Sequence, residues 1–418
     1  MSKINKVYAR EILDSRSTPT VEAVVILDDG NYGVASVPSG ESTGTTEEAA
    51  ELRDKQTDRY LGNGVLTAVS NVNDEIAKKI VGTEAKSIEE IDKTLIDLDG
   101  TRNKGRLGAN AILGVSLAFT KAIAASEKKP LYQYLAEYCQ NDQVLFCPIP
   151  LFNMINGGKH GAGNLDFQEF FVIPSHLRKF SQMLETGSTI YSHIKKLLAR
   201  RGAIHSVGDE GGFAPNLFTN LDAFAILNEA ITAAGHRPGI DVELGLDLAA
   251  DFFFKDGKYT IKDRSSPMEA GELIDYLRDL NGQYHLRILE DPIHKDDWSS
   301  WKQLTAELGS ITTIVGDDLL VTNAERTAKA ISEKACNSIL IKPNQTGTVS
   351  ETIKVCRQAR GAGWKIIVSH RSGETNDTFI SDFSVGVGAD YVKFGAPARG
   401  ERVAKYNRLL AIESEIGT

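Results

Sequence analysis

Six short apolar segments follow one another through residues 242–395, and each closes on a charged or imidazole side chain. They are rich in leucine and β-branched residues and contain no strong turn signal; in order they read VELGLD, LRILED, TTIVGDD, SILIKPN, KIIVSH and YVKFG. Stretches long enough for amphipathic helices separate them. Continuous apolar strands joined by helical crossovers are typical of a parallel sheet buried on both faces. The pattern predicts an α/β fold in which the strands close into a barrel.

The polar residues that end these segments are expected to meet at one mouth of the barrel, because the carboxyl ends of the strands converge there. They are Asp247, Glu290, Asp317, Lys342, His370 and Lys393. A single polar residue after a strand often only begins a loop. Six in succession, of which three are acidic and three are potentially cationic, favour an active site over coincidence.

The chain before the barrel has a different pattern. Residues 6–12, 20–27 and 32–37 alternate as strands around an Asp-Gly turn, which predicts an antiparallel meander. Helical spacing follows from residue 47 to about 126, and a polar stretch at 137–143 precedes Cys-Pro-Ile-Pro. We therefore expect a small N-terminal α+β domain (meander plus helices) at 1–139 and a C-terminal α/β-barrel catalytic domain at 140–418.

Composition excludes several classes of protein. With 418 residues, 41% hydrophobic and 25% charged, the chain can bury a large core. Its net charge of −9 gives no electrostatic support for binding nucleic acid. The N-terminus lacks a signal-peptide core, and the longest apolar run is too short to span a membrane. Four cysteines without paired spacing are expected to be reduced thiols, so we expect a cytoplasmic protein with no membrane partner.

Three of the strand-end residues are carboxylates on successive strands: Asp247, Glu290 and Asp317. Grouped carboxylates repel one another and lose hydration unless a cation offsets both costs. Mg²⁺ prefers oxygen ligands and leaves coordination positions for substrate and water. An ion-pair network would also explain the three acids. The metal site is therefore one of two open interpretations at this point.

The next strand ends at Lys342. A nearby dication would disfavour its ammonium form and make the neutral amine accessible as a base. The alternative is that Lys342 only pairs with one of the carboxylates.

Residues 369–375 read SHRSGET and bring together an imidazole, a guanidinium and hydroxyl groups, which favours anion binding. Lys393 is placed to hold a second anionic group. Glycine-rich loops at 39–44, 157–160 and 208–212 add a lid-like segment, His160 and Glu210. Glu210 is either a turn residue or a general acid.

Seven motifs together resemble the enolase family. The resemblance covers nearly the whole chain, from residues 9–11 to residues 405–407. The motifs are SGESTG (39–44), LGANAILG (107–114), VGDEGGFAP (207–215), EDP (290–292), KPNQ (342–345), SHRSGE (369–374) and GAPAR (395–399). The resemblance implies reversible dehydration of 2-phosphoglycerate to phosphoenolpyruvate, two Mg²⁺ ions per active site, and a homodimer or larger homo-oligomer. It also implies an eight-stranded barrel with an irregular ββαα start, and the strand-like runs 149–155 and 167–173 agree with that start.

The resemblance assigns a role to each candidate residue. Asp247, Glu290 and Asp317 would hold the first Mg²⁺, and Ser42 in the lid would hold the second. Lys342 would take the proton from C2, and Glu210, assisted by Glu169, would protonate the departing C3 hydroxyl. The groups that would surround the substrate are His160, Gln168, Glu169, His370, Arg371, Ser372 and Lys393. Removing a proton beside an ionised carboxylate gives a doubly charged ene-diolate, which the two dications and Lys393 would stabilise. A lysine or histidine base paired with one or two Mg²⁺ ions is already the general pattern of this superfamily, so that pairing comes with the resemblance.

The chain departs from the usual family pattern at Glu41, Ser17-Thr18, Phe252 and Lys295, none of which removes a catalytic residue. Two alternatives agree less well with the residues. Other barrels of the superfamily epimerise or cycloisomerise acids, but they lack the lid at 39–44 and the anion-binding set at 370–372. An inactive scaffold or surface adhesin would be favoured by loss of Lys342 or Glu210, and both are present.

Overall fold

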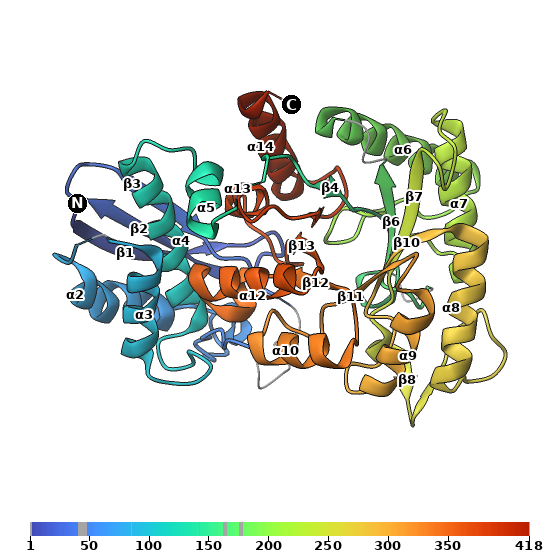
Figure 1. Cartoon of the computed structure of the whole chain (residues 1–418), viewed down its shortest axis with the longest axis horizontal. Coiled ribbons are helices and arrows are strands. Elements are labelled where there is room, and N and C mark those ends of the chain that lie inside the picture. The colour runs from blue at the N-terminus through green and yellow to red at the C-terminus, as the bar shows by residue number, and fades with distance from the viewer. Residues whose placement is uncertain are drawn as a thin grey trace.

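The computed structural model describes residues 2–40, 48–84, 86–141, 143–161, 165–174 and 179–417. The first part of the chain forms a three-stranded antiparallel sheet in the order β1-β2-β3, as the alternating pattern predicts. Its strands are β1 (Ile4–Leu13), β2 (Pro19–Leu27) and β3 (Tyr32–Ser36). The helices that follow are η1 (Tyr60–Gly62), α1 (Leu66–Ser70), η2 (Asn71–Ile76), α2 (Ala77–Ile80), α3 (Ile88–Asp99), α4 (Ala109–Ser126) and α5 (Leu131–Cys139). Figure 1 shows this domain at the left.

Helix α4 is the core helix of the N-terminal domain. It packs on β2 and β3, and nearly every residue along it is buried. The close approach requires a glycine at position 33, where a Cβ atom would lie 2.0 Å from the carbonyl oxygen of Ala118. Among the described residues α4 is also the one helix long and apolar enough to cross a membrane. Its 83% burial inside the protein accounts for that apolar composition.

The second part of the chain forms a nearly closed, mostly parallel barrel. The sheet order is β4-β14-β13-β12-β11-β10-β7-β6-β5. The strand bounds are β4 (Ile149–Pro150), β5 (Phe152–Asn156), β6 (Glu169–Pro174), β7 (Val242–Asp247), β10 (Leu286–Glu290), β11 (Thr313–Gly316), β12 (Ser338–Ile341), β13 (Lys365–Ser369) and β14 (Tyr391–Lys393). Because only Leu151 separates β4 from β5, they act as one strand that pairs with β14 on one side and β6 on the other. The six apolar segments 242–395 are confirmed as strands.

The start of the barrel is irregular, as the family resemblance implies. Strand β6 pairs antiparallel with both β5 and β7, whereas the later strands pair in parallel. Two helices then follow before β7, which gives the ββαα order. The helices of this domain are η3 (Gly158–His160), α6 (Phe180–Arg200), α7 (Asn220–Ala233), η4 (Ala250–Phe252), α8 (Ala270–Tyr284), α9 (Trp298–Leu308), α10 (Ala324–Glu333), α11 (Pro343–Thr346), α12 (Val349–Gly361), α13 (Phe379–Gly386) and α14 (Gly400–Ile416). A small hairpin, β8 (Phe254–Lys255) with β9 (Lys258–Tyr259), follows η4.

Local sequence explains where several barrel helices begin. The side chains of Thr219, Asp297, Asn323 and Thr348 each accept a hydrogen bond from a backbone N–H in the first turn of the helix that follows. Such N-caps satisfy donors that the helix itself cannot pair, and each typically contributes about 1 kcal/mol.

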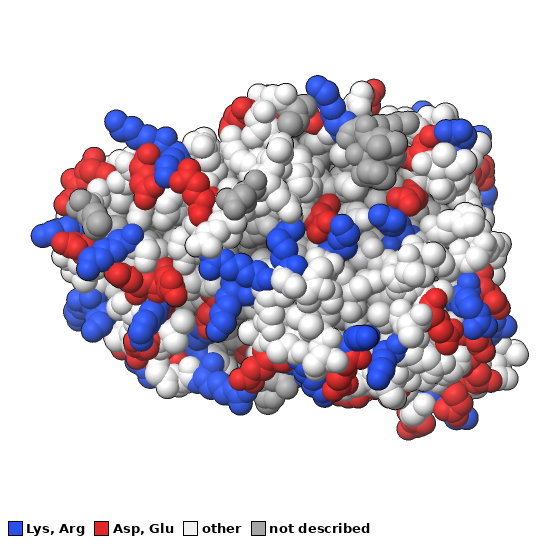
Figure 2. Space-filling model, viewed as in Figure 1, with Lys and Arg blue, Asp and Glu red and all other residues white. Residues whose placement is uncertain are grey.

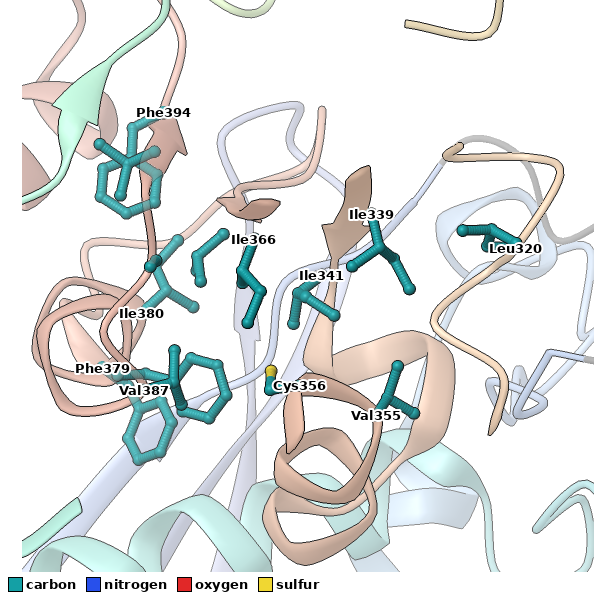
Figure 3. Close-up of a cluster of buried hydrophobic side chains, with 14 of the residues drawn as sticks. Leu320, Ile339, Ile341, Val355, Cys356, Ile366, Phe379, Ile380, Val387 and Phe394 are labelled. Atoms are coloured by element: carbon teal, nitrogen blue, oxygen red, sulfur yellow. The ribbon is translucent and has the colours of Figure 1, made fainter. Parts of the chain in front are cut away.

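The strands are buried on both faces, which explains their unbroken apolar sequence. Side chains that point inward fill the barrel with Leu151, Phe171, Ile173, Ile288, Val315, Leu340, Ile367 and Tyr391. Their neighbours point outward to the surrounding helices. Figure 3 shows this outer layer, in which Ile339, Ile341 and Ile366 face Val355 and Cys356 of α12. Three of the four cysteines are buried and all four are free thiols.

The two domains share a polar interface. Helix α12 of the barrel begins against α3 and α4 of the N-terminal domain, where Asp92 Oδ2 accepts the backbone N–H of Ser350 at 2.8 Å. The hydroxyl of Ser116 accepts the N–H of Val349 at 3.0 Å. Elsewhere the ammonium of Lys121 pairs with Asp377 at 2.8 Å. These contacts fix the N-terminal domain beside the mouth of the barrel.

The surface carries charges of both signs. On the face drawn in Figure 2, the described basic and acidic side chains are intermixed around the margins, and neither sign forms a continuous band there. The charges on this face are therefore of mixed sign.

Candidate active site

The carboxyl ends of the parallel strands and the segments beside them bring the predicted residues to one pocket. Sheet register does this directly, because Asp247 on β7 is paired with Glu290 on β10 and with Glu169 on β6. Ser369 on β13 is likewise paired with Lys393 on β14. The predicted residues that line the pocket are Gln168, Glu169, Glu210, Asp247, Asp317, Lys342, His370, Arg371, Ser372 and Lys393. Glu290 is fully buried beside it.

Lys393 is the cationic centre of the site. Its ammonium nitrogen lies 3.0 Å from Asp247 Oδ2, 2.8 Å from Glu290 Oε1 and 3.1 Å from Glu169 Oε1. Burial opposes its charge, but these carboxylates outweigh burial and raise the pKa of Lys393 well above its ordinary value. Lys393 is therefore a permanent positive charge among three acids.

The acids outnumber the cations that face them. Burial, followed by repulsion from Asp247, raises the pKa of Glu290 well above its ordinary value despite Lys393. Burial and repulsion from Glu210 do the same to the pKa of Glu169. One ammonium does not neutralise this group of carboxyls, so the site favours an additional positive charge.

The buried oxygens fit a hard cation such as Mg²⁺. Glu290 Oε2 and Asp317 Oδ1 are both buried and have no hydrogen-bond partner in the part of the chain that the structure describes. Buried acceptors are rarely left without a partner, and carboxylate oxygen is the ligand that Mg²⁺ prefers. Lys393 shows that an ion-pair network exists as well, so the two interpretations of the acidic triad are compatible.

A second acidic group overlaps the first. Carboxylate oxygens of Asp291, Asp317 and Asp318 lie within 4.8 Å of one another, a spacing that could also hold a metal ion. Asp291 accepts the backbone N–H of Asp317 at 2.9 Å and that of Asp318 at 2.7 Å. It thereby positions the loop that carries Asp317. This role of Asp291 was not predicted from the sequence, although the paired acids in LRILED and TTIVGDD were a visible signal.

Lys342 forms an ion pair with Asp317, as one of the two interpretations of this lysine allows. Its ammonium nitrogen lies 2.5 Å from Asp317 Oδ2. Burial lowers the pKa of Lys342, but the nearby carboxylates, Asp317 first and then Glu290, together outweigh it and the net pKa is raised. In this arrangement the lysine is charged. Lys342 can therefore become a neutral amine, as expected from the sequence, only when Asp317 binds a different partner.

Glu210 is buried and is held by side chains of other elements. Its Oε2 atom accepts a hydrogen bond from Asn153 Nδ2 on β5 at 3.0 Å. The same oxygen lies 3.5 Å from His370 Nε2. Burial and fixed partners are what an acid–base carboxyl requires, so these contacts agree with the general-acid interpretation.

The predicted anion-binding residues Arg371 and Ser372 contact side chains from other segments. Arg371 donates from Nη1 to Asn344 Oδ1 at 3.1 Å, and Arg16 of the N-terminal domain donates to Ser372 Oγ at 3.2 Å. Gly40 lies directly against the Arg371 guanidinium, because a Cβ atom there would lie 1.7 Å from Nη2. Gly40 and Asn344 belong to motifs that the sequence already singled out, whereas Arg16 joins the site only through tertiary structure.

Some predicted positions lie outside what the structure describes. Glu41 and Ser42 fall in the undescribed segment 41–47, and the side chain of His160 at the end of η3 is also outside the described set. Gln168 is described and donates from Nε2 to Asp247 Oδ2 at 3.2 Å. Phe252 lies at the pocket with the Lys159 ammonium 5.5 Å from its ring centre, and Lys295 pairs with Asp251 at 3.5 Å.

Comparison with known protein families gives a match to both domains. The model described as the enolase N-terminal domain matches residues 4–135. The model described as the enolase C-terminal TIM barrel domain matches residues 144–418. Residues 136–143 lie between the two matched ranges.

Proposed function

The chain belongs to the enolase family, and on that premise we propose that it catalyses the reversible dehydration of 2-phosphoglycerate to phosphoenolpyruvate. Membership supports a Mg²⁺-dependent lyase of the enolase superfamily. The observation that carries the finer proposal is the content of one pocket. It combines Lys342 beside buried acids, the carboxyls of Glu169 and Glu210, and the Arg371–Ser372 anion-binding pair.

Substrate binding uses the two cationic regions of the pocket. Arg371 and Ser372 bind the phosphate, because a guanidinium offers a planar pair of donors and a hydroxyl adds a short one. Lys393 lies near the metal-site acids and holds the substrate carboxylate. This orientation directs C2 of the substrate toward Lys342 and C3 toward Glu210.

The metal site is formed by Asp247, Glu290 and Asp317, with Ser42 as the further ligand that the family resemblance implies. Bound Mg²⁺ supplies positive charge that stabilises the doubly charged ene-diolate. Lys393 adds a fixed charge to the same region without any rearrangement.

Proton transfer takes place on two faces of the substrate. Lys342 accepts the C2 proton as a neutral amine, which requires its contact with Asp317 to loosen. Glu210 then donates a proton to the C3 hydroxyl, which leaves as water while the C2–C3 double bond forms. Glu169 assists, because burial and repulsion from Glu210 raise its pKa and favour the protonated carboxyl.

The direct test is the absorbance of phosphoenolpyruvate formed from 2-phosphoglycerate, with and without Mg²⁺. We expect turnover only with the metal. No product in the presence of Mg²⁺ would refute the proposed reaction. Exchange or racemisation at C2 of other carboxylic acids would instead favour a different reaction of the superfamily.

Three further properties remain proposals that rest on family membership. We propose two Mg²⁺ ions per active site, a homodimer, and residence in the cytoplasm. Calorimetric titration of Mg²⁺ measures the number of ions, and sedimentation equilibrium measures the assembly. One ion per site at saturation, or a monomer, would contradict the respective proposal.

A further inference from the structure

Arg402 on α14 is a fully buried arginine whose four terminal N–H groups are all engaged near the active site. Its Nη1 atom lies 2.7 Å from Nδ1 of His370 and 2.6 Å from the carbonyl oxygen of Arg371. Its Nη2 atom donates to the carbonyl oxygens of Asp209 at 3.0 Å and Ser372 at 2.6 Å. Each terminal nitrogen carries two hydrogens, so these four contacts use all of them.

The contact with His370 settles which ring nitrogen carries the proton. A guanidinium only donates hydrogen bonds and stays charged in proteins, so Nδ1 of His370 must be the acceptor. A neutral imidazole that accepts at Nδ1 carries its hydrogen on Nε2. We infer that Arg402 is a positioning residue that fixes His370 as the neutral Nε2–H tautomer and makes it a hydrogen-bond donor inside the site.

The donating nitrogen, Nε2, lies beside the proposed general acid Glu210. Nε2 of His370 is buried, has no hydrogen-bond partner among the described residues, and lies 3.5 Å from Glu210 Oε2. His370 also lines the pocket. Its N–H is therefore available to Glu210 or to an oxygen of a bound molecule beside Glu210.

Arg402 also joins two functional loops through their backbones. Asp209 precedes Glu210 on one loop, and Arg371 and Ser372 form the anion-binding pair on the other. Packing at Gly395 holds this junction closed. A Cβ atom there would lie 2.5 Å from the carbonyl oxygen of Glu210, 3.1 Å from His370 Cε1 and 3.2 Å from Arg402 Cδ.

The charges around His370 act in the same direction as the hydrogen bond. Burial lowers the pKa of His370 to about 3; Glu210 opposes this change, and Arg402 and Lys393 reinforce it. The imidazole is consequently neutral throughout the physiological range. The consequence for catalysis rests on the proposed dehydration, whereas the tautomer does not.

The first experiment measures the tautomer in the intact wild-type protein. Histidine is labelled with ¹⁵N, and the His370 signals are identified by their loss in His370→Gln. Two-bond correlations distinguish the protonation states of the ring. We expect a neutral Nε2–H ring between about pH 5.5 and 8, the range in which an ordinary histidine titrates. An Nδ1–H tautomer, or an imidazolium in that range, would refute the inference whether or not the protein is a dehydratase.

The second experiment tests Arg402 itself. Arg402→Lys keeps the positive charge and loses the two terminal nitrogens of the guanidinium. Arg402→Met removes the charge and keeps much of the side-chain volume. For the variant that folds, we expect the ring to lose its fixed Nε2–H tautomer, because Nδ1 no longer has this donor. In Arg402→Met the pKa of His370 should also rise, since a neighbouring cation is removed while the burial remains. In the dehydration assay kcat should fall about tenfold and its pH profile should change; this loss is less than the roughly 10²–10⁴-fold that an acid–base group itself supplies. A folded variant with unchanged His370 signals and pH profile would refute the assignment.

Lys405→Gln is the matched control. Lys405 is also buried on α14. Its ammonium pairs with Glu374 Oε2 at 2.7 Å and binds the carbonyl oxygens of Thr375 and Glu401, and no described contact joins it to His370. Loss of this buried cation should lower the melting temperature and leave the His370 tautomer unchanged. A change of tautomer in this control would mean that any damage to α14 has the same effect, and would refute a specific role for Arg402.

Discussion

The ammonium nitrogen of Lys342 lies 2.5 Å from Oδ2 of Asp317, so the proposed base and a proposed metal ligand are one buried ion pair. Burial raises the pKa of Asp317, but Lys342 and then Lys393 outweigh it and the net pKa is lowered. Removing either partner leaves a buried charge without its counterion, which is costly. Substitutions at this pair therefore require readouts that separate chemistry from stability.

Isotope exchange separates the base from the acid. Lys342→Ala should abolish both turnover and exchange of the C2 proton with solvent, because Lys342 is the group proposed to accept that proton. Glu210→Gln should lose turnover, roughly 10²–10⁴-fold, while C2 exchange stays measurable. Deuterium incorporation into 2-phosphoglycerate measures the exchange. The opposite pattern in the two variants would reverse the assignment.

Substitution of a metal-site acid tests the cation. Asp317→Asn replaces an anionic oxygen ligand by a neutral one, so the Mg²⁺ concentration for half-maximal activity should rise at least about tenfold. Asp256→Asn, an exposed acid on the β8–β9 turn, removes the same charge and should leave the Mg²⁺ requirement unchanged. An unaltered requirement in Asp317→Asn would leave the acidic triad as an ion-pair network alone.

The contact between Gly40 and Arg371 gives a prediction about anion binding. Gly40→Ala would place a Cβ atom 1.7 Å from Nη2 of Arg371, so the guanidinium must move. We expect KM for 2-phosphoglycerate to rise at least about tenfold, which is about 1.4 kcal/mol of lost binding. Gly271→Ala meets nothing within 4 Å and serves as the control. An unchanged KM in Gly40→Ala would show that Arg371 does not bind the phosphate.

Stability between about pH 4 and 6 should depend on Asp92. Burial raises the pKa of this carboxyl to about 6 in the folded protein, against an ordinary value of 3.8. The folded state therefore holds the proton more tightly than the unfolded state. The stabilising contribution is fully present below about pH 4 and is lost as the pH rises through about 6, when the buried carboxyl must ionise.

Asp92→Asn removes that ionisation and keeps a side-chain oxygen for the N–H of Ser350. Its free energy of unfolding relative to wild type should increase from pH 4 to 7, by on the order of 1–3 kcal/mol. Denaturant unfolding at several pH values measures the difference. Asp97→Asn, an exposed position on the same helix, should show no such trend. A constant difference for Asp92→Asn would contradict an elevated pKa.

Much of the architecture could be predicted from local sequence. The unbroken apolar runs identified the strands of the barrel, because a strand that is buried on both faces carries apolar side chains on both. The alternating runs before residue 37 identified the meander, because apolar and polar side chains alternate along a strand that is buried on one face. The antiparallel direction of β6 was not visible in its composition and followed only from the family resemblance, since Phe-rich strands look alike in either direction.

The site was only partly visible in the sequence. Lys342, His370 and Lys393 could be proposed because each ends a strand, and motif residues such as Glu210 because they lie in glycine-rich loops. Asn153, Asp291 and Arg402 could not, since they act through hydrogen bonds to partners that the sequence does not specify. Arg402 resembles any other basic residue on a helix until its burial against His370 is known.

The sequence by itself determined which residues end the strands, because apolar periodicity and the polar residue that follows it are local properties of the chain. Only the tertiary structure decided how their charges combine. Lys393 reaches Asp247 across 146 positions and Glu290 across 103 because closure of the sheet sets their register. The pKa changes, the unsatisfied oxygens that suit a cation, and the tautomer of His370 all depend on burial and on distances of about 3 Å. Those distances are set by packing between segments that are remote in the chain, and no local pattern encodes them.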